Sequence, residues 1–217
     1  MITPVPTAQR QRARAILAIL KRRYPGVGTA LHFADPLQLL VATILSAQCT
    51  DERVNRVTAQ LFQKYRTVDD YATADPRELE RDIHSTGFFR AKARNIIGAA
   101  RRILAVYGGK VPDTMEQLVT LPGVARKTAN IVLSHGFGKI EGIAVDTHVR
   151  RLSYRIGLSN HDDPERIEQD LMLLFERTDW PAVSDLLIAH GRAVCAARSP
   201  RCTACTVQPH CLQRIER

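Results

Sequence analysis

The stretch Leu121-Pro122-Gly123-Val124-Ala125-Arg126-Lys127-Thr128-Ala129 decides the fold of this chain. It lies between two predicted helices, over residues 114–121 and 125–135, and its Pro and Gly separate them. A glycine-containing hairpin followed by a helix start leaves backbone N–H groups clustered, which forms an anion site suited to a DNA phosphate. Such contacts carry no sequence information, so they suit a protein that scans any DNA.

Outward from this hairpin, apolar residues recur at helical spacing, and strand-like alternation is nearly absent. Start and stop signals such as Asp75-Pro76 and Gly108-Gly109 divide the pattern. We therefore predict an all-α fold with short connections. The predicted helices cover residues 7–23, a helix opened by Pro36, 52–65 with Asp51 as its cap, a short helix opened by Pro76, 88–107, 114–121, 125–135, 146–156, 164–177 and 181–196.

The charge balance is the informative part of the composition. The 217 residues include 31 Lys and Arg against 22 Asp and Glu, a net charge of +9. A basic surface favours polyanions, of which nucleic acid is the commonest, although a merely solvated basic surface is the alternative. The chain contains no apolar run long enough to span a membrane, and Met1 to Arg14 lacks a signal-peptide core. We expect a cytoplasmic protein without a membrane partner.

Four cysteines cluster near the C-terminus, at Cys195, Cys202, Cys205 and Cys211. This segment has little helical periodicity and is too short and polar for a core, so metal binding is expected to fold it. Zinc takes four cysteines, but its sites usually pair two C-x2-C knuckles, and one is present here. An iron–sulfur cubane tolerates irregular spacing and is favoured, while disulfides are the third alternative. Cys49 stands apart, and we expect a small buried residue.

Two arginines, Arg198 and Arg201, lie between the first two cysteines. They are either solvated charges or part of a loop, held rigid by the metal, that contacts DNA phosphates. We favour the second interpretation in view of the basic charge and the hairpin.

Two residues are candidates for catalysis. Lys127 falls in the first turn of the helix after the hairpin, where the positive end of the helix dipole disfavours a protonated amine. A neutral lysine amine is the nucleophile that Schiff-base chemistry needs, although a plain surface lysine is the alternative. Asp146, in the string Val145-Asp146-Thr147-His148, is either a helix N-cap, a carboxylate that assists base departure, or both. We expect His148 to be structural.

These motifs together resemble the endonuclease III family of DNA glycosylases. The resemblance rests on the hairpin string, on Val145 to His148, on the cysteine spacing and on Leu45-Ser46-Ala47-Gln48-Cys49-Thr50-Asp51. It runs in order over nearly the whole chain. It implies a two-lobed helix-hairpin-helix fold: a six-helix barrel over 29–139, with the helix-hairpin-helix at about 114–135, and a domain formed by 1–28 and 140–217 that holds a [4Fe-4S] cluster.

The resemblance also implies an activity and a set of roles. The protein would be a bifunctional DNA glycosylase and AP lyase of base excision repair, a monomer associated with the bacterial nucleoid. It would remove oxidised pyrimidines from double-stranded DNA with damaged bases or abasic sites. Lys127 would attack C1′, and the resulting Schiff base would permit β-elimination on the 3′ side, with Asp146 assisting. The four clustered cysteines would ligate the cluster.

Residues for DNA contact follow from the same resemblance. Gln48 would fill the space left by a flipped-out base, and the segment with Thr86 and Phe88 would wedge the opposite strand, although Phe88 and Phe89 are equally suited to a core. The hairpin would bind phosphate through Gly123, Ala125, Arg126 and Thr128. Ala125 departs from the family pattern, which usually has glycine there. If that position needs a positive φ or a close phosphate approach, alanine weakens binding.

Several rival functions are open at this stage. An adenine-mispair glycosylase generally lacks the lysine and has a further C-terminal domain, and a thymine-mispair glycosylase is harder to exclude. A DNA-binding module with a structural metal would not need both Lys127 and Asp146. A redox protein would leave the hairpin and the basic charge unexplained.

Overall fold

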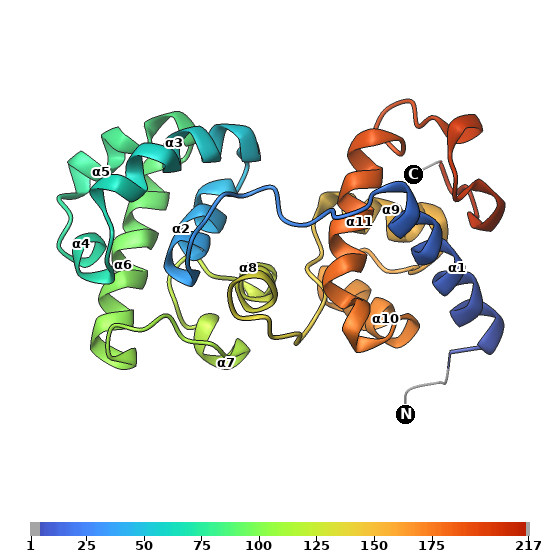
Figure 1. Cartoon of the computed structure of the whole chain (residues 1–217), viewed down its shortest axis with the longest axis horizontal. Helices are drawn as coiled ribbons and strands as arrows, with labels where there is room; N and C mark the ends of the chain where they lie inside the picture. The colour runs from blue at the N-terminus through green and yellow to red at the C-terminus, as the bar shows by residue number, and fades with distance from the viewer. Residues whose placement is uncertain (1–4, 216–217) are drawn as a thin grey trace. The chain divides into compact units, whose positions relative to one another are not determined.

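The computed structural model describes residues 5–215, and it consists of helices joined by short loops (Figure 1). No strand occurs among these residues, which confirms the predicted all-α class. The chain divides into two compact units: unit 1 comprises Met1–Thr29 and Gly142–Arg217, and unit 2 comprises Ala30–Glu141. Residues 1–4 and 216–217, which belong to the predicted cluster domain, lie outside the described part. No described helix is long and apolar enough to cross a membrane.

Unit 2 is built around one long helix, α6 (Phe89–Tyr107), against which several of the shorter helices pack. The apolar face of α6 includes Ile96, Ile97 and Ile103, all buried. Helix α2 (Pro36–Ser46) is buried from Leu39 to Leu45. The other elements of this unit are α3 (Asp51–Lys64), α4 (Val68–Ala72), α5 (Pro76–Asp82), η1 (His84–Thr86), α7 (Met115–Leu118), α8 (Arg126–Ile131) and the π-helix η2 (Val132–Gly136).

Unit 1 joins the beginning of the chain to its end. Helix α1 (Thr7–Arg23), blue in Figure 1, packs against the orange α10 and α11. Ile16 and Leu20 of α1 share one buried core with Leu171 and Leu187. The other elements of this unit are α9 (Thr147–Ile156), α10 (Pro164–Leu174), η3 (Arg177–Asp179), α11 (Trp180–Ala193), η4 (Cys202–Ala204) and η5 (Gln208–His210).

Most helix starts follow local chemistry. An Asp or Thr at the N-cap accepts a hydrogen bond from a backbone N–H of the first turn, which satisfies one of the four N–H groups that have no partner in the helix. Proline at the first helical position follows three of these caps, at α2, α5 and α10. The side-chain caps are Asp35, Thr50, Thr67, Asp75, Thr114, Asp146 and Asp163.

Several predicted boundaries differ from the structure: the helix predicted over 114–121 ends at Leu118, and the one predicted over 181–196 ends at Ala193. Three further differences have identifiable reasons. The cap of α3 is Thr50 rather than Asp51, because the Thr50 hydroxyl accepts from the N–H of Arg53. Phe88 is not in α6 but precedes it in a left-handed conformation. The helix predicted to reach residue 177 ends at Leu174, where the backbone becomes extended at Phe175. The short helix α4 was not predicted at all.

Candidate nucleic-acid interface and cysteine-lined cavity

The predicted hairpin joins α7 to α8 in unit 2. Leu121 and Val124 are buried and anchor it, and the N–H of Val124 donates to the carbonyl of Leu121 at 3.1 Å. Gly123 lies between them, exposed, with φ of +79°. Helix α8 starts at Arg126, so Lys127 is its second residue and is exposed, as expected for the first turn.

Glycine is required at position 123 but not at 125. A Cβ on Gly123 would approach the Cβ and Nδ2 atoms of Asn95 to 2.8 Å, in addition to the positive φ. Ala125 is the N-cap of α8 with φ of −90° and ψ of 170°, an extended conformation open to any residue. The departure from the family pattern at Ala125 therefore adds no backbone strain. Its methyl group offers no hydrogen-bond acceptor to the first turn of α8.

Two further segments of unit 2 present exposed residues in an unusual conformation. Gln48, between α2 and α3, is exposed and has φ of +53°. Phe88, directly before α6, is 65% exposed and has φ of +47°. Left-handed backbone costs a non-glycine residue about 1–2 kcal/mol, so it persists only where the surroundings impose it. Phe88 is therefore not a core residue, whereas Phe89 is half-buried and packs against His84.

Thr86 and Cys49 differ from the expectation. Thr86 is 2% exposed, and its hydroxyl donates to the carbonyl of Ile83 at 2.8 Å. Its side chain therefore holds the loop and does not face solvent, so DNA contact by this side chain is not supported. Cys49 is half-buried against the core of unit 2 rather than fully buried.

Asp146 belongs to unit 1, where it caps α9. Its Oδ1 accepts from the N–H of Val149 at 2.8 Å, so the N-cap interpretation holds. His148, two residues later, lies 3.1 Å from Nη2 of Arg151 through its Nδ1 and packs closely against Gly191 of α11. This contact agrees with the structural role expected for His148.

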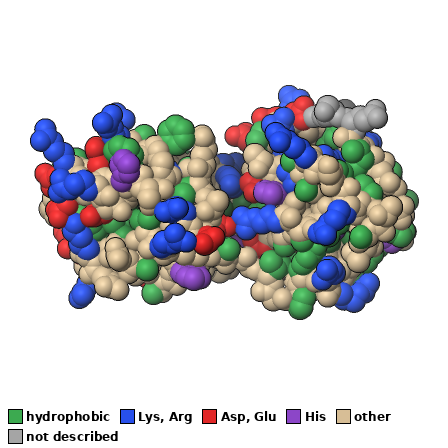
Figure 2. All heavy atoms as spheres, turned by 90° about the horizontal axis from the view of Figure 1, so that it is seen from above, with side chains coloured by type: hydrophobic (Ala, Val, Ile, Leu, Met, Phe, Trp, Pro, Cys, Tyr) green, Lys and Arg blue, Asp and Glu red, His purple; other side chains and the backbone are tan. Residues whose placement is uncertain are grey.

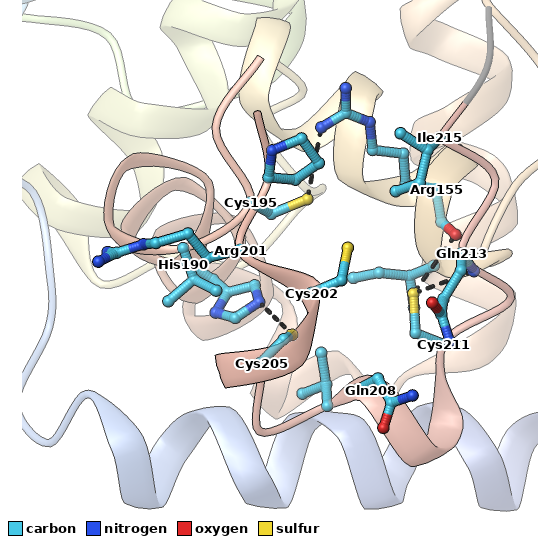
Figure 3. Close-up of a pocket in the computed structure, with 14 residues that line it drawn as sticks. Arg155, His190, Cys195, Arg201, Cys202, Cys205, Gln208, Cys211, Gln213 and Ile215 are labelled. Carbon is cyan, nitrogen blue, oxygen red and sulfur yellow. Dashed lines mark hydrogen bonds between the residues drawn. The ribbon is translucent and has the colours of Figure 1, made fainter. Parts of the chain in front are cut away.

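The four clustered cysteines line one pocket in unit 1, and Figure 3 shows their side chains around a shared space. Between Cys195 and Ile215, Val207 alone is buried, so the segment has almost no apolar core. Burial raises the pKa of the Cys205 and Cys211 thiols above the ordinary value. His190 is buried beside Cys205, with Nε2 and Sγ 3.3 Å apart, and burial lowers its pKa to about 4.

Arginine side chains hold this segment by its backbone. Arg151 donates to the carbonyls of Gly191 and Cys195. Arg155 donates to those of Ala196 and Ala197, at 2.7 and 3.0 Å, and its Nη1 lies 3.6 Å from Sγ of Cys195. From α1, Arg12 reaches the carbonyls of Ile156 and His210, each at 2.8 Å.

The four thiols are a donor set that suits a thiolate-ligated metal group. A tetrahedral zinc ion needs all four sulfurs within about 2.3 Å of one point. Among residues 5–215, no group of three or more His, Cys, Asp or Glu side chains is arranged to hold a single metal ion. Four thiols line one pocket, and Nη1 of Arg155 lies 3.6 Å from Sγ of Cys195, so a positive charge stands beside the thiol group.

Four buried or half-buried basic residues were not predicted from the sequence, whereas the two predicted arginines of the cysteine segment are exposed. Arg12, Arg151, Arg155 and the buried Lys92 were missed, although a charged residue on an apolar helix face is a signal for all but Arg12. Arg198 and Arg201 are exposed, and the guanidinium of Arg201 donates to the carbonyl of Ala193. Figure 2 shows Lys and Arg side chains at several separate places on the visible face of each unit, with some Asp and Glu between them.

The comparisons place this chain in a known family. The pattern of the family described as "HhH-GPD superfamily base excision DNA repair protein" matches residues 41–177. The chain therefore belongs to the HhH-GPD superfamily of base excision DNA repair proteins. It is 57% identical to endonuclease III of Synechocystis over 94% of this chain and 93% of the relative, and 45% identical to endonuclease III of Bacillus subtilis over 89% of each.

Solved structures agree with this placement. A trapped covalent endonuclease III–DNA intermediate superposes with a TM-score of 0.90 and 41% identity, covering 98% of this chain and 97% of that one. Within the superfamily, the protein is therefore of the endonuclease III family. It is a base excision repair enzyme, a DNA glycosylase with AP lyase activity, and DNA is its partner.

The hairpin geometry predicts that Gly123→Ala weakens both folding and DNA binding. A left-handed alanine costs about 1–2 kcal/mol, and the contact with Asn95 adds to it because α6 must shift. Urea unfolding and fluorescence anisotropy with a DNA duplex measure the two effects. The matched control is Ala125→Gly, which should bind DNA as the wild type does. Wild-type affinity in Gly123→Ala would contradict a role for the hairpin in binding.

Proposed function

We propose that this enzyme removes oxidised pyrimidines from duplex DNA and cleaves the strand 3′ to the abasic site, with Lys127 as the nucleophile. The single observation that supports Lys127 is its place as the exposed second residue of α8, directly after the hairpin. The bacterial relatives are consistent with work in the cytoplasm, on the nucleoid.

Lys127 would act on the sugar of the damaged nucleotide. Its Nζ forms a bond to C1′ of the damaged nucleotide, the N-glycosidic bond breaks, and the base leaves with the bonding electrons and a proton. The sugar ring opens to give a Schiff base between Nζ and C1′. Loss of a proton from C2′ then expels the 3′ phosphate by β-elimination, and hydrolysis of the Schiff base releases Lys127.

We assign Asp146 a second role beside its cap. The carboxylate is half-buried at the start of α9, where Oδ1 accepts from Val149. Held in this way, it is suited to accept or return the proton that moves as the base departs.

DNA contacts are proposed for three segments of unit 2. The α-helices of this unit begin with an Asp or Thr side-chain cap except at α6 and α8, which follow Phe88 and Ala125. Without a side-chain acceptor, the first N–H groups of these two helices are suited to phosphate oxygens. The third segment carries Gln48, an exposed side chain able to donate and accept hydrogen bonds.

A [4Fe-4S] cluster is proposed for the cysteine-lined cavity, held by Cys195, Cys202, Cys205 and Cys211. The bound cluster supplies metal–thiolate bonds that replace the missing apolar core of this segment. The segment then presents Arg198 and Arg201, both exposed, to the DNA backbone. The arginines from α1 and α9 balance the charge of the thiolates.

Borohydride trapping tests the nucleophile. On a duplex that contains thymine glycol, the wild type should form a covalent complex because reduction fixes the Schiff base, whereas Lys127→Ala should form none. The exposed Lys110→Ala serves as the matched control and should be trapped normally. Trapping of Lys127→Ala at the wild-type level would assign the nucleophile to another amine. No trapping of the wild type, with DNA binding retained, would favour a monofunctional glycosylase.

Asp146→Asn separates catalysis from capping. Asparagine caps helices about as well as aspartate, so the melting temperature should change little. Base release should fall by about 10²–10⁴-fold, because the amide cannot accept a proton or stabilise positive charge. Thermal unfolding and single-turnover base release measure the two effects. Asp146→Ala should lose stability as well. Full activity of Asp146→Asn would reduce Asp146 to a cap.

Metal analysis tests the cluster. Purified protein should contain about four iron atoms and four acid-labile sulfides per chain. Cys202→Ser should lose both and should melt at a lower temperature, because its segment has no other core. Cys49→Ser, which lies outside the cavity, should keep its full iron content. If the purified wild type contained zinc and no sulfide, the proposed cluster would be wrong and the cysteines would form a zinc site.

A further inference from the structure

Lys92 is a buried lysine whose role the proposed chemistry does not require. It lies in the first turns of α6 and is 4% exposed. Its position continues the buried face formed by Ile96, Ala99 and Ile103 at spacings of four, three and four residues. A lysine this deeply buried needs hydrogen-bond partners for its ammonium group.

Two backbone carbonyls are these partners. Nζ of Lys92 donates to the carbonyl of Leu45 at 2.8 Å and to that of Thr86 at 2.8 Å. Leu45 lies in the last turn of α2, where carbonyls lack helical partners, and the N–H of Cys49 donates to Ser46 instead. Thr86 ends η1. One ammonium group therefore joins two segments that are 41 positions apart in the chain, as the numbers of Leu45 and Thr86 show.

Both segments lead directly into an exposed residue with left-handed backbone. Gln48 follows Leu45 by three positions, and Phe88 follows Thr86 by two. Their φ angles are +53° and +47°, and such strain persists only where neighbouring structure fixes the chain on either side. The two bonds of Lys92 supply this fixation at the start of each segment. Apart from these two, unit 2 has no non-glycine residue with positive φ.

We propose that Lys92 is a positioning residue that holds Gln48 and Phe88 together as one DNA-probing unit. The inference rests on the proposed function, because Gln48 and Phe88 have this task only if the enzyme flips a nucleotide out of a duplex. An ammonium has three donors, so a single side chain sets both segments at once. If one segment moves, Nζ of Lys92 moves with its carbonyl, and the hydrogen bond to the carbonyl of the other segment is disturbed.

The charge of Lys92 is stabilised by dipoles rather than by an ion pair. The carbonyl end of α2 favours a cation. Burial lowers the pKa of Lys92, and the nearby Cys49 acts in the opposite direction. Two hydrogen bonds to fixed backbone carbonyls restrict the position of the ammonium group more than a solvated ion pair would. This restriction suits a residue that positions others.

The first test compares Lys92→Met with Lys110→Met, an exposed lysine that loses the same charge. Binding is measured by anisotropy on a duplex with a tetrahydrofuran abasic analogue. Lys92→Met should bind on the order of tenfold more weakly, and Lys110→Met should bind as the wild type does. Borohydride trapping on a single-stranded abasic oligonucleotide should be equal in all three proteins, because that substrate has no opposite strand. Equal loss on single and double strands would overturn the proposal.

A double-mutant cycle separates positioning from plain stability. Gln48→Ala and Phe88→Ala should each weaken duplex binding in the wild type, and each should have much less effect in Lys92→Met, with a coupling of about 3- to 100-fold. Full additivity would overturn the role of Lys92 and leave the proposed function intact. No loss from either alanine in the wild type would overturn their DNA role, and the inference with it.

The proposal is testable even if Lys92→Met does not fold. If Lys92 joins the two segments, the effects of Gln48→Ala and Phe88→Ala on duplex binding should depend on each other in a chain that keeps Lys92. A change in one segment should then alter the position of the other. Their effects on duplex binding should then be less than additive when combined. Strict additivity of the two would overturn the proposal.

Discussion

Hydrogen bonds from arginine to backbone carbonyls hold the cysteine-bearing end of unit 1, which has almost no apolar core. Arg151 and Arg155 extend from α9, whose N-cap is Asp146, to the carbonyls around Cys195. Arg12 adds α1 to the same group. The helix that positions the candidate carboxylate is thus also the support of the candidate metal site.

The α-helices of unit 2 begin in two ways: most have a side-chain cap that stabilises the helix, and two have none. Elsewhere in this unit, an Asp or Thr satisfies the first turn. A side-chain cap on α6 or α8 would stabilise the helix by about 1 kcal/mol, but its oxygen would occupy the N–H groups that a phosphate needs. The uncapped starts after Phe88 and Ala125 therefore coincide with the segments proposed to contact DNA.

Local signals predicted most of the helices, and tertiary effects account for the rest. Pro36 and Pro76, each after an Asp cap, marked helix starts correctly, since the cause lies within a few residues. The end of α10 and the left-handed Phe88 depend on packing and were not predictable from periodicity. In the candidate site, the hairpin and the cysteine spacing were evident in the sequence. The partners of Lys92 were not, because hydrogen bonds to distant carbonyls leave no sequence pattern.

The discontinuous composition of unit 1 has a consequence for the order in which the chain folds. Unit 2 is one continuous segment and can be completed while later residues are still being synthesised. Helix α1 emerges before unit 2, yet its core partners Leu171 and Leu187 emerge more than 140 residues after Ile16 and Leu20, as their numbers show. During synthesis, the apolar face of α1 therefore stays without these core partners until unit 2 has been completed.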